Sequence, residues 1–400
     1  MKSIHWLKSL IILPLFFLTF TACLQNAEQK IDIKLLCGAD QTERYLPLLD
    51  GKRVGLVANH SSLINNTHLA DSLLSLDVKL IRVFGPEHGF RGVADAGEHV
   101  VNGVDTKTGL PVVSLYGNNR KPTPDQLEGL DLILFDLQDV GVRFYTYIST
   151  LTYVMEAASE NGIPLIILDR PNPNGFYIDG PVMEEEFTSF VGLHPIPIVY
   201  AMTIGEYGMM VNGEAWLKNG IKCDLTIISL KNYDRNKLYK LPLKPSPNLP
   251  IWQSVYLYPS LCLFEGTVVS VGRGTDAPFT CYGHPGFHIG SFTFKPEPRE
   301  GAKHPKLEGE QCYGQSLLGY ANNFREMESH INLQWLLGAY EHINTDNFFI
   351  PYFEKLAGNG DLRTQIKSGS TQEQIKGSWQ DDINTFKETR KKYLIYEDFE

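Results

Sequence analysis

Short apolar segments alternate with helical patterns between Lys52 and Pro173, and this alternation restricts the fold more than any other feature of the chain. The segments are rich in Val, Ile and Leu and are bounded by turn residues, as expected of strands buried on both faces. They are Val54–Ala58, Val78–Phe84, Pro111–Leu115, Leu130–Leu137 and Ile163–Leu168. Strands that alternate with helices predict an α/β fold, here a Rossmann-like, doubly wound parallel sheet.

End signals and apolar faces predict helices between these strands. Asn66–Leu76 carries leucines on one side, and Thr150–Glu160 ends at an Asn-Gly pair. Thr123 and Pro124 offer an N-cap and a proline at the first helical position.

A further helix is predicted from Thr203 to Asn219-Gly220, because Thr203 and Glu206 have the spacing of a capping box. Glu206 is therefore expected to be a cap rather than a catalyst. No GxGxxG follows the first strand, so no dinucleotide is expected, and we predict no other cofactor.

The composition changes in the second half of the chain. Residues 241–260 hold five prolines and predict a linker between a Rossmann-like domain, residues 31–240, and a smaller C-terminal α/β (α+β) domain, residues 261–400. This second part has apolar runs at Leu261–Phe264, Thr267–Val271 and Phe287–Phe294, then helical patterns at Gln334–His342 and Thr371–Lys391. Ser370 and Glu373 are the expected caps of the last helix.

The first 22 residues have the pattern of a processing signal. Lys2 and Lys8 precede the apolar run Leu10–Phe20, which is well under the roughly 20 residues that span a bilayer. The following Thr-Ala-Cys resembles a bacterial lipobox, which implies cleavage before Cys23, acylation of Cys23 and a polar tether over residues 23–30. We therefore expect a periplasm-facing membrane lipoprotein of a Gram-negative bacterium; the alternative is a plain secretory peptide.

Charge and cysteine content exclude some classes of partner. The net charge falls from −10 to −12 when residues 1–22 are removed, because two lysines and no acids are lost. An acidic chain without a basic stripe argues against nucleic acid as a partner. The cysteines after Cys23 form no CxxC pair, so scattered buried thiols, or one or two disulfides, are expected rather than a metal site. They are at positions 37, 223, 262, 281 and 312.

Charged and aromatic residues follow several of the predicted strands. The carboxyl ends of parallel strands share one edge of a sheet, so such residues are expected to meet there. They include Glu87, His88 and Arg91 after one strand, Asp136, Asp139, Arg143 and Tyr145 after another, and Asp169, Arg170 and Asn172 after a third. Each group also has a structural interpretation as a cap, an ion pair or half-buried core, but carboxylates gathered in a cleft perturb one another's pKa values as acid and base catalysis requires.

Several segments resemble one known family. They are Phe84–Gly92, Ala96-Gly97-Glu98, Phe135–Tyr147, Leu168–Asn174, Glu265-Gly266-Thr267 and Gly272–Phe279. In content and order they are similar to the hallmark segments of the NamZ-type peptidoglycan exo-β-N-acetylmuramidases. The resemblance covers nearly the whole mature chain. It implies a Rossmann-like N-terminal domain, a smaller C-terminal domain and an active site in the cleft between them.

The resemblance also implies a reaction, the removal of single N-acetylmuramic acid (MurNAc) residues from non-reducing ends of peptidoglycan fragments. The catalytic glutamate of the family's Gly-Pro-Glu-His-Gly motif falls on Glu87. Glycoside cleavage commonly uses two carboxyl groups, so we expect Glu87 as general acid. Its partner is Glu98, Asp136 or Asp139, unless the substrate's own 2-acetamido group is the nucleophile.

Muramic acid also carries a lactyl carboxylate, for which a planar guanidinium is a suitable partner. Arg143, Arg91 and Arg273 are the candidates. We expect one cleft lined by Glu87, Arg143 and Asp169 and faced by Glu265 or Arg273. The full predicted substrate-binding set is His88, Arg91, Arg143, Tyr145, Asp169, Arg170, Asn172, Glu265 and Arg273.

Two other functions compete with this hypothesis. A metal-dependent amidase or deacetylase would draw its ligands from His60, His88, Asp95, His99 and His284. No HExxH pair is present, so we predict no metal. A glycan-binding lipoprotein without catalysis would use as sugar platforms Tyr145, Tyr147, Trp252 and Tyr256.

Overall fold

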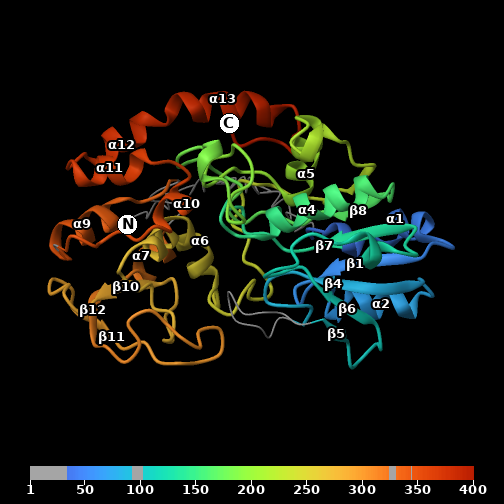
Figure 1. The fold of residues 1–400 in the computed structure, drawn as a ribbon, viewed down its shortest axis with the longest axis horizontal. Coiled ribbons are helices and arrows are strands. Elements are labelled where there is room, and N and C mark those ends of the chain that lie inside the picture. Colours follow the sequence, from blue (N-terminus) through green and yellow to red (C-terminus); the bar gives the residue numbers. More distant parts are fainter. Residues whose placement is uncertain (1–33, 92–101, 324–329, 344) are drawn as a thin grey trace, which may run out of the picture. The chain divides into compact units, whose positions relative to one another are not determined.

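Seven strands form the main sheet in the order β5-β6-β4-β1-β7-β8-β9 (Figure 1). The strands are β1 Val54–Ala58, β4 Leu80–Gly85, β5 Gly103–Val104, β6 Pro111–Ser114, β7 Leu132–Asp136, β8 Leu165–Leu168 and β9 Leu225–Ile228. All neighbours pair in parallel except β5 and β6. Every residue of β1 and β7 is buried, as their continuous apolar sequences require. The predicted Rossmann-like sheet is therefore confirmed.

This computed structural model describes residues 34–91, 102–323, 330–343 and 345–400. Around the main sheet lie the hairpin β2 Leu63–Ile64 and β3 Thr67–His68 and the helices α1 Thr42–Leu49, α2 Leu69–Ser75, α3 Pro124–Leu127, α4 Tyr147–Glu160 and α5 Ile204–Gly213. Thr123 caps α3, with Pro124 at its start, as predicted. No helix in these described ranges is both long and apolar enough to cross a membrane.

The proline-rich stretch is only partly a connection. Helix α6, Trp252–Leu261, begins inside it and is buried along most of its length. The 3₁₀ turn η4, Cys262–Gly266, follows at once, so the apolar run predicted at Leu261–Phe264 is helical rather than a strand. One hydrophobic core contains residues from both sides of this stretch, among them Phe135 and Phe353, and Leu35–Glu400 forms one compact unit.

A second, antiparallel sheet has the order β10-β12-β11 and consists of β10 Cys281–His284, β11 Phe292–Phe294 and β12 Cys312–Ser316. The helices of this part are α7 Leu318–Asn322, α9 Gln334–Ile343, α10 Phe353–Ala357, α11 Asp361–Lys367, α12 Gln372–Ser378 and α13 Gln380–Lys391. The C-terminal part is therefore α+β. The five described cysteines are free thiols, and burial raises the pKa of Cys37 and Cys223 to about 11.

The predicted helix Thr371–Lys391 is two helices. The chain leaves helical geometry at Trp379, whose buried indole Nε1 donates a hydrogen bond to Asp179 Oδ1 at 3.2 Å. The cap is also one residue later than predicted: Thr371 and Gln374, rather than Ser370 and Glu373, form the capping box. The predicted capping box thus lies one residue from the observed one. The break between the two helices falls at Trp379, where the indole forms its tertiary hydrogen bond to Asp179.

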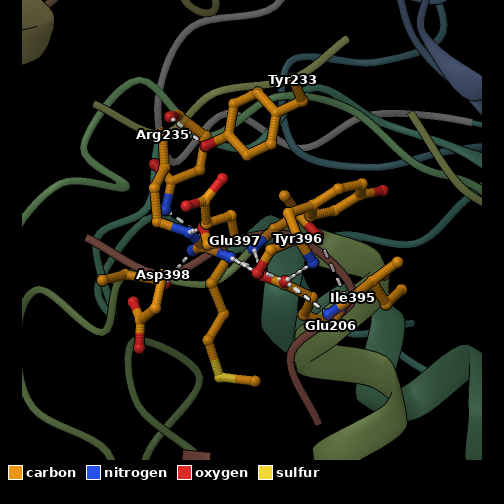
Figure 2. A network of polar contacts seen from close by, with 12 residues as sticks. Glu206, Tyr233, Arg235, Ile395, Tyr396, Glu397 and Asp398 are labelled. Carbon is orange, nitrogen blue, oxygen red and sulfur yellow. Dashed lines mark hydrogen bonds and ion pairs between the residues drawn. The ribbon is translucent and has the colours of Figure 1, made fainter. Parts of the chain in front are cut away.

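Glu206 caps α5 as predicted, accepting a hydrogen bond from Thr203 N at 2.9 Å through Oε2. The helix stops at Gly213, before the predicted end, since Ala215 takes a left-handed conformation. The other carboxylate oxygen of Glu206 binds Arg235 at 2.8 Å, in a fully buried ion pair. Figure 2 shows this pair beside the last residues of the chain: Ile395 N donates to Glu206, and Arg235 Nε donates to Glu397 O.

Candidate active site

A cavity of about 790 Å³ lies where the C-terminal part of the chain meets the strand exits of the main sheet. Its volume is within the range of small-molecule sites. Glu87 and His88, after β4, and Phe144–Thr146, before α4, form one wall. Residues of η4, of the loop that follows it and of α10 form the other. The cavity therefore joins the two parts of the chain that the sequence predicts to share a site.

Glu87 is positioned by a tight turn directly after β4. A side chain at Gly85 would come within 2.8 Å of Phe90 N, and His88 has a φ of 70°, so the chain reverses where only glycine fits and a second residue is held left-handed. Thr146 Oγ1 donates a hydrogen bond to Glu87 Oε2 at 2.7 Å. Glu87 is thus held between the end of β4 and the start of α4.

Glu265 and Arg273 lie on the opposite wall. Arg273 Nε donates to Glu265 Oε2 at 3.1 Å, and each side chain keeps 22% of its surface exposed. The Arg273 guanidinium also lies 4.9 Å from the ring centre of Phe279. Burial alone would lower the pKa of Arg273, but the charge and hydrogen bond of Glu265, together with other nearby acidic groups, offset this and raise it.

Aromatic rings line the cavity near these charges. Tyr258 packs edge-on against Phe144 at 5.3 Å and against Phe279 at 5.0 Å. Tyr145 lies 6.2 Å from Tyr258, and its hydroxyl donates to Pro245 O at 2.7 Å. These rings give the cavity an apolar surface on which the C–H face of a sugar ring can pack.

Three predicted acids are not in the cavity. Asp136 forms a bidentate ion pair with Arg170, at 2.5 and 2.7 Å, and is fully buried. Asp139 accepts hydrogen bonds from Tyr200 and from Gly141 N, and burial raises its pKa to about 6. Neither residue lines the cavity. Asp136 and Asp139 are therefore not placed to act as the second catalytic carboxylate.

Asp169 is the third of these acids. It accepts hydrogen bonds from Gly205 N, Thr203 and Tyr396, at 2.8, 2.8 and 2.5 Å. Burial raises its pKa to about 7. The side chain holds the start of α5 and the end of the chain, and the predicted position of Asp169 in the cleft is wrong.

The predicted arginines also fall into two groups, those that line the cavity and those that do not. Arg143 is fully buried and donates to the carbonyls of Pro181, Ile196, Leu356 and Ala357, at 2.6–2.9 Å. Burial lowers its pKa to about 9. Arg143 thus links α10 to the first part of the chain. It does not line the cavity, so its predicted position in one cleft with Glu87 is wrong.

Arg91 and Asn172 also lie outside the cavity lining. Arg91 forms a bidentate ion pair with Asp105, at 3.0 and 2.6 Å. Asn172 donates to Met202 O at 2.8 Å. Of the predicted set, the cavity is lined by Glu87, His88, Tyr145, Glu265 and Arg273. Glu98 lies outside the described residues, as do Asp95, His99 and Cys23.

The described residues of the two competing functions do not form one site. Within the part of the chain that the structure describes, no three His, Cys, Asp or Glu side chains are grouped as metal ligands. His60 Nε2 lies 2.8 Å from Lys244 O. Tyr147 and Tyr256 are buried core residues. Trp252 lines a second, separate pocket, where the Lys240 ammonium lies over its ring.

Sequence reasoning missed several residues of the cavity. They are Arg120, Phe190, Lys303, His304, Lys306, Tyr352 and Lys355. Among described residues, five lysines and arginines line the cavity against two glutamates, in a chain of net charge −10. The one signal in the sequence is the run Lys303–Lys306, which is cationic in an acidic chain; the others come from separate loops without a shared pattern.

Two family profiles match consecutive parts of the chain. The family profile "Exo-beta-N-acetylmuramidase NamZ, N-terminal" matches residues 54–253, and the corresponding C-terminal profile matches residues 256–396. The chain is 42% identical over 376 residues to the peptidoglycan β-N-acetylmuramidase NamZ of Bacillus subtilis (strain 168), covering 88% of this chain and 89% of that protein.

Two crystal structures of DUF1343 family proteins from Bacteroides fragilis have the same fold. One is 43% identical, with a TM-score of 0.85, over 91% of this chain and 99% of that one. The other is 28% identical, with a TM-score of 0.75, over 91% and 100%. The two family profiles and the Bacillus relative account for most of the described chain, which therefore belongs to the NamZ family of exo-β-N-acetylmuramidases, a family of glycoside hydrolases.

Proposed function

We propose that this protein releases MurNAc from the non-reducing ends of peptidoglycan fragments during cell-wall turnover and recycling, with Glu87 as the general acid. The observation that carries the proposal is the position of Glu87 in a cavity formed by both family-matched parts of the chain. The Bacillus relative, named for this activity, supports the substrate class.

Glu87 delivers its proton to the glycosidic oxygen as the bond to C1 breaks. The Thr146 hydroxyl orients the carboxyl group through its hydrogen bond to Oε2. The lactyl carboxylate of MurNAc gives the substrate a negative charge, which the excess of lysine and arginine around the cavity attracts. Neither step needs a metal or an organic cofactor.

The test compares Glu87→Gln with the wild type on two substrates. Glutamine keeps the shape of the acid but has no proton to give, so turnover of the disaccharide MurNAc-β-1,4-GlcNAc falls by about 10²- to 10⁴-fold. A 4-nitrophenyl β-N-acetylmuramide loses less, because nitrophenolate leaves without protonation. The exposed Glu388→Gln is the matched control. Glu206→Gln is unsuitable, since it disturbs a buried ion pair.

Near-normal turnover of the disaccharide by folded Glu87→Gln would reject the acid assignment. Loss of wild-type activity in EDTA would instead favour a metal-dependent hydrolase. An exo-acting enzyme releases MurNAc monomers from longer chains from the start of the reaction, and early appearance of internal fragments would contradict that mode.

We further propose that the mature chain is anchored by acylated Cys23 to a membrane facing the periplasm. The support is the sequence pattern of residues 1–23. A Cys23→Ser variant is expected in the soluble fraction, without the lipid mass of the wild type. A variant that stays in the membrane fraction would contradict the anchor.

A further inference from the structure

Two carboxylates of described residues line the cavity, Glu87 and Glu265, and they come from different parts of the chain. We propose that Glu265 is the second catalytic carboxylate. In this role it carries the negative charge that faces C1 of the sugar from the side opposite to the leaving oxygen. This inference rests on the proposed function and adds the residue that completes the reaction.

Both glutamates line the cavity together with Tyr352. The pKa of Tyr352 is raised first by burial and then by nearby acidic groups, Glu265 and Glu87 among them. One phenol therefore lies within electrostatic reach of both carboxylates. Such a position is expected if the two acids face one sugar from opposite walls.

Glu265 is paired with the Arg273 guanidinium, a partner suited to a carboxylate that acts as an anion. Glu87 accepts a hydrogen bond from the hydroxyl of Thr146. Glycoside cleavage commonly uses two carboxyl groups in one site, one that donates a proton and one that acts as the carboxylate. With Glu87 proposed as the general acid, the anionic role falls to Glu265.

The backbone that carries Glu265 is unusually well fixed. Lys306 Nζ lies within 2.6–3.3 Å of four carbonyl oxygens, those of Phe264, Glu265, Thr267 and Val269. The Thr267 hydroxyl adds a hydrogen bond to Phe264 O at 2.8 Å. A reacting group needs this kind of support, because small displacements of a catalytic side chain are costly.

The other described acids considered for this role are excluded by burial. Asp136 and Asp139 are 0% and 3% exposed, and their carboxylates are held by Arg170 and by Tyr200. No sugar can reach them without opening the core. Glu265 keeps a surface on the cavity.

The reaction balances with these two groups. Glu87 gives its proton to the leaving oxygen as the C1–O bond breaks, and Glu265 offsets the positive charge that develops at C1. The oxygen of one water molecule bonds to C1, and one of its protons passes to the Glu87 carboxylate, which restores the proton that Glu87 gave up. One glycosidic bond is exchanged for one molecule of water.

The experiment uses Glu265→Ala on the disaccharide and on the 4-nitrophenyl muramide. Both substrates are expected to lose about 10²- to 10⁴-fold in turnover, because the charge at C1 is needed whatever the leaving group. Glu87→Gln, by contrast, spares the nitrophenyl substrate. Azide can enter the space left by the carboxylate, bond to C1 and restore turnover of the nitrophenyl substrate. The recovered product is the α-azide, since attack comes from the face opposite to the β-linked leaving group.

Three results would overturn the assignment: near-normal turnover by Glu265→Ala, no recovery with azide in a protein that melts like the wild type, or a β-azide product, which would show participation of the substrate's acetamido group. Glu265→Gln keeps the side-chain size if the alanine variant does not fold, and Glu388→Ala is the matched control. If the wild type does not cleave either substrate, the proposed function fails; if it does and Glu265→Ala does too, only this inference fails.

Discussion

At the scale of single residues, the acids that follow the strands of the main sheet have two different environments. Glu87 reaches a cavity, whereas Asp136, Asp139 and Asp169 are buried and surrounded by hydrogen-bond donors. A buried carboxyl group keeps its charge only when its partners replace water. Asp136 has a guanidinium for this purpose, but Asp139 has a phenol and one backbone N–H.

Asp139→Asn is expected to change the pH dependence of stability while leaving activity at neutral pH close to that of the wild type. The folded pKa of about 6 lies above the ordinary value of 3.8, so the folded state keeps a proton that the unfolded state loses. The contribution of Asp139 to the free energy of unfolding therefore falls as the pH rises from about 4 to about 6, by up to about 1.4 kcal/mol per pH unit. Above a pH of about 6 this contribution is constant. Urea unfolding between pH 4 and 7.5 measures the difference between wild type and variant.

The exposed Asp382→Asn serves as the control and should follow the wild type at every pH. A constant offset between Asp139→Asn and the wild type across this interval would contradict the raised pKa. A large loss of turnover in a folded Asp139→Asn protein would restore Asp139 as a catalytic candidate.

The sequence predicted that acids gather near the strand ends, but it could not separate reacting acids from structural ones. Glu87 and Asp139 both follow a buried strand, and their spacing from it is similar. The difference depends on which way the turn sends the side chain, and that is decided by contacts such as Tyr200 with Asp139, which are 61 residues apart. Arg143 was misplaced for the same reason, because its partners at 356 and 357 are more than 200 residues away.

At the scale of elements, the short turn η4 and the loop after it carry the charged wall of the cavity. The Lys306 ammonium donates hydrogen bonds to backbone carbonyls of both segments. Burial lowers the pKa of Lys306, because the ammonium loses contact with water. From its hydrogen bond to Glu265 O we expect Lys306 to be a positioning residue for Glu265.

Lys306→Met is expected to reduce kcat by about 10- to 100-fold, with a smaller change in KM, because Glu265 loses its fixed backbone while the binding surface largely remains. Steady-state kinetics on the disaccharide separates the two parameters. Lys306→Arg keeps a positive donor at this position and should recover part of kcat. Equal kcat for the wild type and Lys306→Met would contradict the positioning role.

Elements with strong periodicity were predictable and the others were not. The central strands are continuous apolar runs, so their positions were clear. Strands β10 and β12 have the sequences CYGH and CYGQS, which mix glycine and polar residues and give no such signal. Helices α12 and α13 form one periodic pattern, and the break at Trp379 depends on a hydrogen bond to a distant aspartate.

At the scale of the whole molecule, the C-terminal residues contact the main sheet at the end of β8 and helix α5. Arg390 donates to Ala201 O and pairs with Asp398, and the Tyr396 hydroxyl donates to Asp169. Glu206 accepts a hydrogen bond from Ile395 N (Figure 2). The chain thus passes through the C-terminal helices and returns to the carboxyl ends of β8 and to α5. The family match up to residue 396 includes most of this return.

Deletion of residues 395–400 is expected to lower the free energy of unfolding by more than about 3 kcal/mol, because the buried Glu206 and Arg235 lose polar partners without gaining water. Urea unfolding measures the loss. Deletion of Glu400 alone removes a partly exposed ion pair with Lys387. It is the control and should cost no more than about 1 kcal/mol. Equal midpoints for the two deletions would show that the tail is not needed for stability.

The return of the tail to Glu206 and Arg235 also fixes when the protein can finish folding during its synthesis. The groups that close this network, from Ile395 to Asp398, are synthesised long after Glu206, which Ile395 follows by 189 residues. Every nascent chain therefore holds a buried ion pair that is still open on one side until these residues have been made. Domains that are complete early can fold while the rest is made, but here the first sheet stays unsealed until residues 395–398 have left the ribosome.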